Sequence, residues 1–251
     1  GSKSFVTGQV ETLVAWTSNV NSSTDPDNSN DTLTQDISPA ISGTFVIDAA
    51  GNGDYQDFTS AVVGINSFGV CGPVVFDVVT GTYNEQFQLL NIEGTSSTNT
   101  ITFQPDANNT GAVKIEYSAA SSSDNYIINF VGASHVTVDG LEIEALSSST
   151  GHTLNFDEGS SNNTIKNCVL TSPQGSSTSV DGANIYANSN NISYNNFMYN
   201  EVVGGSYNVY FRGSSANSNI ENSFMNNTFM DAYYYGVYLY YQDSYKFNYN
   251  T

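Results

Sequence analysis

Between Tyr126 and Thr251 the sequence repeats itself, and this repeat restricts the possible folds more than any other feature. Five runs of alternating apolar and polar residues recur there, and they read YIINFVG, HTLNFDEG, ANIYANS, YNVYFRG and YGVYLYY. Alternation with a period of two residues is typical of β-strands. Regular recurrence of such runs is typical of a protein built from stacked structural repeats.

A second β-type run follows each of the first runs. Matching the second runs at Val138, Ile165, Tyr194, Met225 and Phe247 gives spacings of 27, 29, 31 and 22 residues. Clusters of Gly, Ser and Asn, which favour turns, separate the runs. Two short strands and no helix in each repeat predict an all-β, right-handed parallel β-helix. Neither the leucine-rich repeat nor the propeller blade fits this period and pattern.

Stacked coils would place equivalent side chains above one another, at a spacing of roughly 4.8 Å. The apolar positions of the first runs would then form one interior file: Ile128, Leu154, Ile185, Val209 and Val237. The polar positions between them would form an outward column that includes Tyr186, Tyr210 and Tyr238. Arg212 and Tyr240 would lie in the adjacent outward column.

The outward tyrosines have two alternative explanations. Stacked rings stabilise one another by about 0.5–1.5 kcal/mol per pair beyond burial, so the column can be structural. An exposed row of Tyr186, Tyr210, Tyr238 and Tyr240 beside Arg212 can instead bind a surface glycan or a partner protein, because a phenol ring is both apolar and hydrogen-bonding. Both explanations require that the coils stack in register.

The segment before the repeats has a different pattern. Phe58, Ala61, Val62 and Ile65 recur at helical spacing. The spacing predicts a short amphipathic helix that covers the open N-terminal end of the apolar core, the protection that a terminal repeat requires.

The stretch GDYQDFTSAVVGIN, followed by GPVVFDVVTGTYNEQFQL, resembles the opening of pectin-lyase-like β-helix proteins. The version GVCGPVVFDVVTGTYNEQ is similar to large secreted surface proteins of gliding Bacteroidota, including gliding adhesins exported by the type IX system. The resemblance covers residues 41–251. It implies a non-enzymatic segment of an extracellular, cell-surface adhesin or stalk, with a β-helix domain at residues 39–251 that is truncated at its C-terminus.

Residues 1–38 read as a strand, a long polar loop and a second strand. They resemble the last hairpin of the immunoglobulin-like adhesion modules found in such surface proteins. The alternative is a hairpin that caps the β-helix. The first alternative makes the chain part of a longer, multidomain protein.

The charge balance excludes several partners. The chain holds 24 acidic and 5 basic residues, for a net charge of −19, and the basic residues are scattered. Nucleic acid, anionic membranes and acidic polymers would be repelled. No apolar run reaches the roughly 18 residues of a membrane span, so no membrane insertion is expected.

Pectin-lyase-like proteins include lyases, esterases and hydrolases, so the resemblance also implies a polysaccharide-acting enzyme as the alternative function. The nearest outward candidates are Asp157 and Arg212. They would lie two coils apart, roughly 10 Å, which is too far for a paired acid and base. No catalytic residue is predicted; an active site of this class would lie beyond residue 251 or around these two side chains.

One loop has the spacing of a calcium site. Asp25, Asp27, Ser29, Asp31 and Asp36 occupy positions 1, 3, 5, 7 and 12 of a calcium-loop pattern. Asn30 stands where that pattern needs Gly, and Asp36 where it has Glu, so a plain polar loop is the alternative. No other cofactor is expected. Cys71 and Cys168 are expected to be two buried free thiols or, alternatively, one disulfide.

Overall fold

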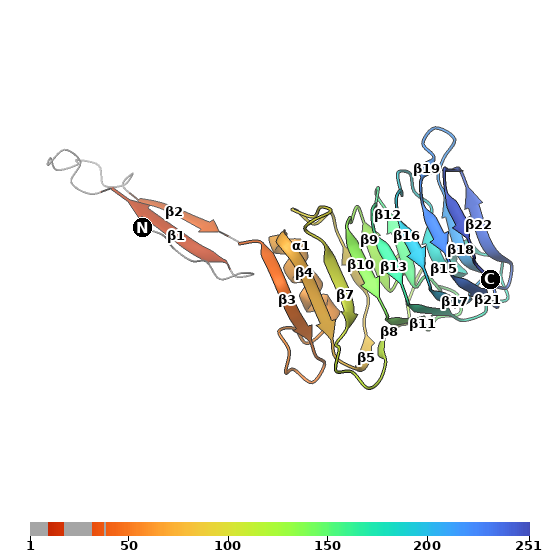
Figure 1. Cartoon of the computed structure of the whole chain (residues 1–251), viewed down its shortest axis with the longest axis horizontal. Coiled ribbons are helices and arrows are strands. Elements are labelled where there is room, and N and C mark those ends of the chain that lie inside the picture. The colour runs from red at the N-terminus through yellow and green to blue at the C-terminus, as the bar shows by residue number, and fades with distance from the viewer. Residues whose placement is uncertain (1–9, 18–31, 38) are drawn as a thin grey trace.

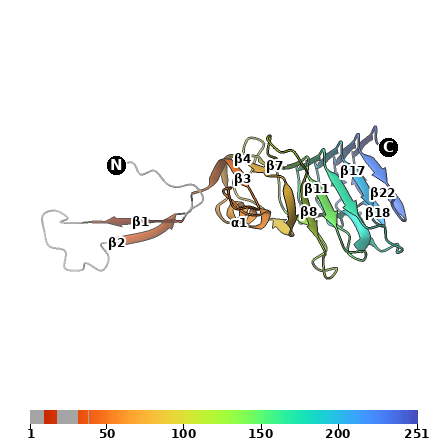
Figure 2. The ribbon, with the colours of Figure 1, turned by 90° about the horizontal axis from the view of Figure 1, so that it is seen from below.

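The computed structural model describes residues 10–17, 32–37 and 39–251. In the described part before residue 39, β1 (Glu11–Trp16) and β2 (Thr32–Ile37) pair as an antiparallel hairpin. Figures 1 and 2 show this hairpin standing apart from the remaining strands. The two strands predicted for this segment are thus confirmed.

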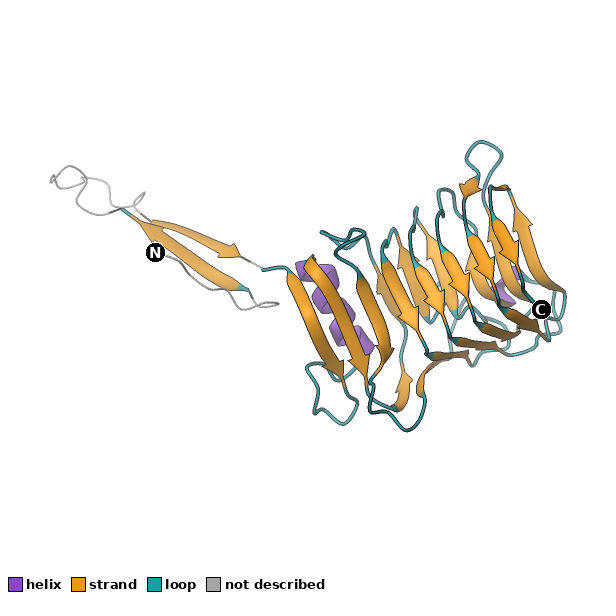
Figure 3. Ribbon diagram, in the orientation of Figure 1, coloured by secondary structure: helices purple, strands orange, loops and turns teal. Residues whose placement is uncertain are grey.

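Residues 41–251 wind through three parallel sheets that lie along the long axis of the molecule (Figures 1 and 3). The first sheet holds β3 (Ile41–Ile47), β4 (Val70–Val78), β7 (Ile101–Pro105), β10 (Val136–Asp139), β13 (Thr164–Lys166), β16 (Asn196–Met198), β20 (Ser223–Met225) and β24 (Lys246–Asn248). The second holds β5 (Gly81–Asn84), β8 (Val113–Tyr117), β11 (Glu142–Ala145), β14 (Val169–Ser172), β17 (Glu201–Gly204) and β21 (Thr228–Met230). The third holds β6 (Phe87–Leu89), β9 (Ile128–Val131), β12 (Leu154–Asp157), β15 (Ala183–Ala187), β18 (Tyr207–Arg212) and β22 (Tyr235–Tyr240).

This pairing confirms the parallel β-helix, because each strand inside a sheet pairs with the equivalent strands one coil before and one coil after it. The predicted interior file is also confirmed in the third sheet: its members pair in register and all but the half-buried Val237 are fully buried. Two short β-strands, β19 (Asn219–Ile220) and β23 (Gln242–Asp243), pair in the loops beside this stack. No helix among the described residues is long and apolar enough to cross a membrane.

Two details of the predicted coil are wrong. Each full coil has three strands rather than two, because a short strand of the second sheet follows every strand of the first except β3 and β24. The interior partners of Val138 and Ile165 are Phe197, Phe224 and Phe247, not Tyr194 and Met225. Tyr194 lies at a bend with a φ of 60°, and Met225 points away from the core because its neighbour Phe224 is fully buried.

The coil corners contain buried asparagine columns that the sequence analysis missed. Asn163 donates from its amide to Asn195 (3.0 Å), which donates to Asn222 (3.2 Å). Along the other corner Asn200 donates to Asn227 and Asn227 to Asn250, both at 3.0 Å. Each acceptor oxygen also takes a backbone N–H from the preceding coil, as Asn195 does from Asn163 (3.1 Å). The columns therefore supply partners to backbone donors that the sheets leave unpaired.

The helix α1 (Phe58–Phe68) covers the N-terminal end of the core, as predicted. Asp57 caps it by accepting a hydrogen bond from the Ser60 amide (2.7 Å), and its buried face includes the four predicted residues. Phe58 stacks on Phe87 with ring centroids 5.4 Å apart. Asn66 bonds to the Gln88 carbonyl (2.9 Å) and the Leu90 amide (3.1 Å), so the helix also satisfies the exposed edge of β6.

Candidate functional site

The outer face of the third sheet carries the predicted tyrosine column. Strand pairing places six side chains in one file: Gln88, Asn129, Asn155, Tyr186, Tyr210 and Tyr238. Within its polar half, the Asn155 amide donates to the Asn129 side-chain oxygen (2.9 Å). The in-register arrangement expected for Tyr186, Tyr210 and Tyr238 is therefore present.

The three tyrosine rings of this file lie face to face, and the imidazole of His152, from the segment before β12, stacks on the first of them. His152 stacks on Tyr186 (4.2 Å between centroids, 12° between planes), Tyr186 on Tyr210 (5.5 Å, 14°) and Tyr210 on Tyr238 (4.9 Å, 8°). We refer to these four residues as the ring ladder. Because the strand spacing is close to the stacking distance of aromatic rings, in-register coils stack the rings along the axis.

Stacking covers the ring faces that the sequence analysis expected to be exposed. Tyr210 retains 7% of its surface, and Tyr207 packs against it edge to face (5.3 Å) with 6% exposed. Ala183 completes a small apolar cluster with these two residues on the outer side of the sheet. The expectation of a flat exposed row is therefore wrong for Tyr210: a ligand at this face would meet the edges of the inner rings, not their faces.

Arg212 and Tyr240 lie beside the ladder on adjacent strands and face each other in register. Both are exposed, and a hydrogen bond from Arg212 to Tyr210 raises the pKa of the guanidinium. Asp157 lies on β12, two coils away, and its carboxylate accepts the Glu158 backbone N–H (2.8 Å). The structure thus separates Asp157 from Arg212 as expected and does not form an acid–base pair from them.

His152, at the end of the ladder, is buried between two backbone carbonyls. Its Nδ1 lies 2.9 Å from the Asn125 oxygen and its Nε2 lies 2.9 Å from the Val180 oxygen. A neutral imidazole has one N–H and can donate to only one of them. Burial lowers the pKa of His152 to about 4, although both carbonyls act in the opposite direction. The ring is therefore neutral at neutral pH, and it connects the segments around Asn125 and Val180 to the ladder.

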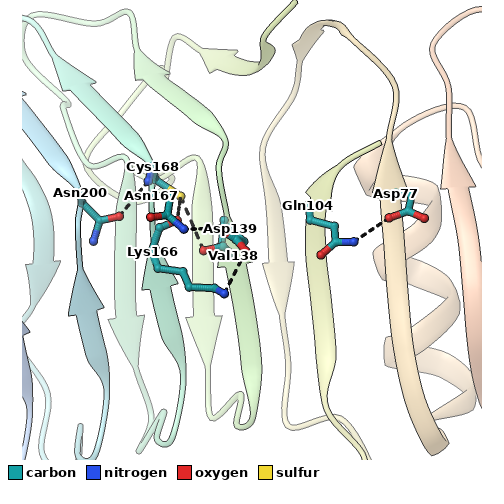
Figure 4. Close-up of polar contacts among 8 residues, drawn as sticks. All are labelled: Asp77, Gln104, Val138, Asp139, Lys166, Asn167, Cys168 and Asn200. Atoms are coloured by element: carbon teal, nitrogen blue, oxygen red, sulfur yellow. Dashed lines mark hydrogen bonds and ion pairs between the residues drawn. The ribbon is translucent and has the colours of Figure 1, made fainter. Parts of the chain in front are cut away.

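The outer face of the first sheet carries a polar cluster that sequence analysis missed (Figure 4). Gln104 donates to Asp77 (2.9 Å), and Lys166 forms an ion pair with Asp139 (3.0 Å). Asn167 donates to the other oxygen of Asp139 (2.7 Å). The signal was present as TFQ, TVD and TIK at matching strand positions, where the last residue of each run points outward on successive coils. Each carboxylate here already has a hydrogen-bonding partner.

The cysteines do not form a disulfide in the described structure, and only one of them is buried. Burial raises the pKa of the Cys168 thiol to about 12, and its sulfur contacts the Lys166 carbonyl oxygen (3.1 Å). Cys71 is exposed. The expectation of two buried thiols is thus correct for Cys168 and wrong for Cys71, which lies near the start of β4, where its sulfur contacts the Ala40 carbonyl oxygen (3.4 Å).

Most of the predicted calcium loop lies outside the described residues: Asp25, Asp27, Ser29 and Asp31. The fifth position, Asp36, is described and accepts a hydrogen bond from the Thr12 hydroxyl across the hairpin (2.7 Å). Among the residues that the structure describes, no cluster of His, Cys, Asp and Glu is arranged for a metal. The calcium site stays a prediction.

No protein-family model and no curated protein matches the sequence. Solved structures similar to it are pectin methylesterases. The enzyme from Erwinia chrysanthemi is 13% identical over 73% of this chain, with a TM-score of 0.47, and the match spans 54% of that enzyme. The Aspergillus niger enzyme is 12% identical over 84% of this chain and 90% of its own (TM-score 0.46). The rice weevil enzyme is 14% identical over 84% and 68% (TM-score 0.45).

These similarities are low, and they concern fold alone. The assignment of a parallel β-helix rests on the strand pairing of this chain, which winds three parallel sheets around one apolar core.

Proposed function

We propose that this chain is a non-enzymatic segment of a secreted cell-surface adhesin or stalk, and that it binds a glycan or a partner protein through the outer face of the third sheet. The observation that carries the proposal is the continuous file of amides and phenols on that face, flanked by exposed Arg212 and Tyr240. The resemblance to surface proteins of gliding Bacteroidota and their type IX export supports the cellular context.

The chemistry of this face favours a neutral, hydroxyl-rich ligand. Exposed Gln88 and half-buried Asn155 present amides, while Tyr238 and Tyr240 present hydroxyl groups at the ring edges. Such groups exchange hydrogen bonds with sugar hydroxyls without needing charge complementarity. This matters because a net charge of −19 would repel an acidic polymer.

The experiment that tests the proposal is a glycan array with the wild-type protein, Tyr238→Phe and Arg212→Gln. Each variant removes hydrogen-bonding groups while keeping most of the side-chain volume, so melting temperatures should stay unchanged. Loss of a ligand hydrogen bond should weaken binding about tenfold. Tyr245→Phe changes an exposed tyrosine before β24 and serves as the control. Unchanged binding by both variants would contradict the proposal.

The second candidate function is a polysaccharide esterase or related enzyme of the pectin-lyase-like class. The observation in its favour is that Asp77, Asp139 and Lys166 share the outer face of the first sheet, where carboxylates could act as acid, base or nucleophile. Release of methanol from methyl-esterified pectin, abolished by Asp139→Asn, would establish this alternative. The adhesin proposal expects no release by the wild-type protein.

A further inference from the structure

Four tyrosines occupy bends where the backbone has a positive φ. They are Tyr194 (60°), Tyr199 (58°), Tyr241 (53°) and Tyr249 (56°). The left-handed region is disfavoured for bulky side chains and tolerated by Asn, whose short polar side chain can bond locally. An aromatic residue at such a bend therefore needs a compensating reason.

Tyr199 and Tyr249 belong to one column of bends between the first and second sheets. Each directly follows a residue of the first sheet that is paired in register, and the other members of the column are Gly140, Asn167 and Asn226. These asparagines have φ values of 54° and 57°. The column therefore reads Gly, Asn, Tyr, Asn, Tyr along successive coils, so its last four members alternate Asn and Tyr.

Packing does not explain the two tyrosines. Tyr199 is 60% exposed and Tyr249 is 86% exposed. In the described part of the chain, neither ring contacts another aromatic ring and neither hydroxyl forms a hydrogen bond, in contrast to the ring ladder. More than half of the surface of each side chain is thus open to a ligand, at positions where the backbone would favour Asn.

The spacing of the two rings limits the ligand. Two coils separate them, which corresponds to roughly 10 Å along the β-helix axis. In an extended β-1,4-linked polysaccharide each sugar is turned over relative to the next. Every second sugar therefore presents the same face, and the length of about two sugar units is the distance that the two rings would have to match. The Asn226 amide lies between the rings and can bond to the intervening sugar.

We propose that Tyr199 and Tyr249 form a second binding edge, separate from the third sheet, for a neutral β-1,4-linked polysaccharide lying along the β-helix axis. Alternate sugars stack on the two rings. The acidic surface of the protein makes a neutral chain the better ligand than a uronic acid polymer.

The test uses Tyr199→Asn, which introduces the residue that the neighbouring coils have at this bend. Binding is measured by calorimetric titration with cellohexaose and mannohexaose, with the α-linked maltohexaose as the control ligand. Removing one stacking ring should weaken binding of a β-linked hexasaccharide about tenfold, and Tyr199→Asn with Tyr249→Asn should abolish it. The melting temperature should be unchanged or higher. Tyr194→Asn, at a bend on the other side of β16, is the matched control and should bind as the wild type does.

Several results would overturn this inference. The wild-type protein could bind neither β-linked hexasaccharide, or it could bind maltohexaose equally well. Binding could be unchanged in Tyr199→Asn. A lower melting temperature of that variant would show that the ring has a structural role. Tyr238→Phe distinguishes the two proposed faces. If it weakens cellohexaose binding while Tyr199→Asn does not, the second edge is wrong and the third-sheet proposal stands.

Discussion

The ring ladder and the bend tyrosines use the same residue type in opposite environments. In the ladder, Tyr210 stacks between Tyr186 and Tyr238 and keeps 7% of its surface exposed. At the bends, Tyr199 and Tyr249 keep 60% and 86% and make no ring contact among the described residues. The ladder has a tyrosine on three consecutive coils, whereas the bend column has one on every second coil.

This difference shows how coil register decides what an aromatic side chain can do. When tyrosines lie on adjacent coils, their rings contact each other and cover each other's faces, so they stabilise the fold. When the tyrosines lie two coils apart, their rings are too far apart to stack on each other and stay accessible to a ligand. The number of tyrosines in the sequence therefore does not measure the size of a binding surface.

Tyr210→Ala should have the largest effect on stability. It removes a nearly buried ring with two stacked neighbours and an edge contact to Tyr207, and should lower the free energy of unfolding by about 4 kcal/mol. For a chain of this size the melting temperature should fall by about 10 °C. The matched variant Tyr199→Ala should change the free energy of unfolding by no more than about 0.5 kcal/mol. An equal decrease in melting temperature for Tyr210→Ala and Tyr199→Ala would contradict the distinction between the ring ladder and the bend tyrosines.

Acid should weaken the ladder through His152. The pKa of this ring is about 4 in the fold and 6.5 in the unfolded chain, so the unfolded state binds the proton first as pH falls. Its contribution is complete above pH 6.5 and decreases by about 3 kcal/mol as pH falls to 4. Denaturant titrations across this range should show the decrease in the wild type and a smaller one in His152→Gln. An identical pH dependence in both proteins would contradict the assignment.

Tyr199→Asn should have a smaller effect than the acid titration, and it should be stabilising. Relief of the left-handed conformation should raise the free energy of unfolding by about 1 kcal/mol. The same change at Tyr186, in the ladder, should destabilise the protein, because there the ring stacks on both His152 and Tyr210. Chemical denaturation of the two variants side by side measures the sign of the change in the free energy of unfolding for each.

Much of the fold follows from the sequence, because alternation in the first runs fixes which residues face inward. Ile128, Leu154, Ile185, Val209 and Val237 could be aligned for that reason. The second runs were misaligned because a left-handed bend and a buried asparagine interrupt the alternation near Tyr194. Asn195 and Asn200, like Asn222 and Asn227, lie five residues apart, and this recurring pair marks both corners and the missed third strand.

The candidate sites were less predictable than the fold. The sequence placed Tyr186, Tyr210 and Tyr238 in one column, but it could not show that the rings would cover each other, since that depends on side-chain orientation. The left-handed bends at Tyr199 and Tyr249 depend on coil geometry that strand periodicity does not encode. Asp77 and Asp139 were missed because each is the single charged residue of an otherwise ordinary strand.

Tyrosine nitration followed by peptide mass spectrometry tests most directly whether the two groups of tyrosines differ in this way. The structure predicts rapid modification of Tyr199 and Tyr249 and protection of Tyr207 and Tyr210, which retain 6% and 7% of their surface. Modification of Tyr210 at the rate of Tyr199 in the native protein would contradict the stacked ladder and the coil register on which both proposals depend.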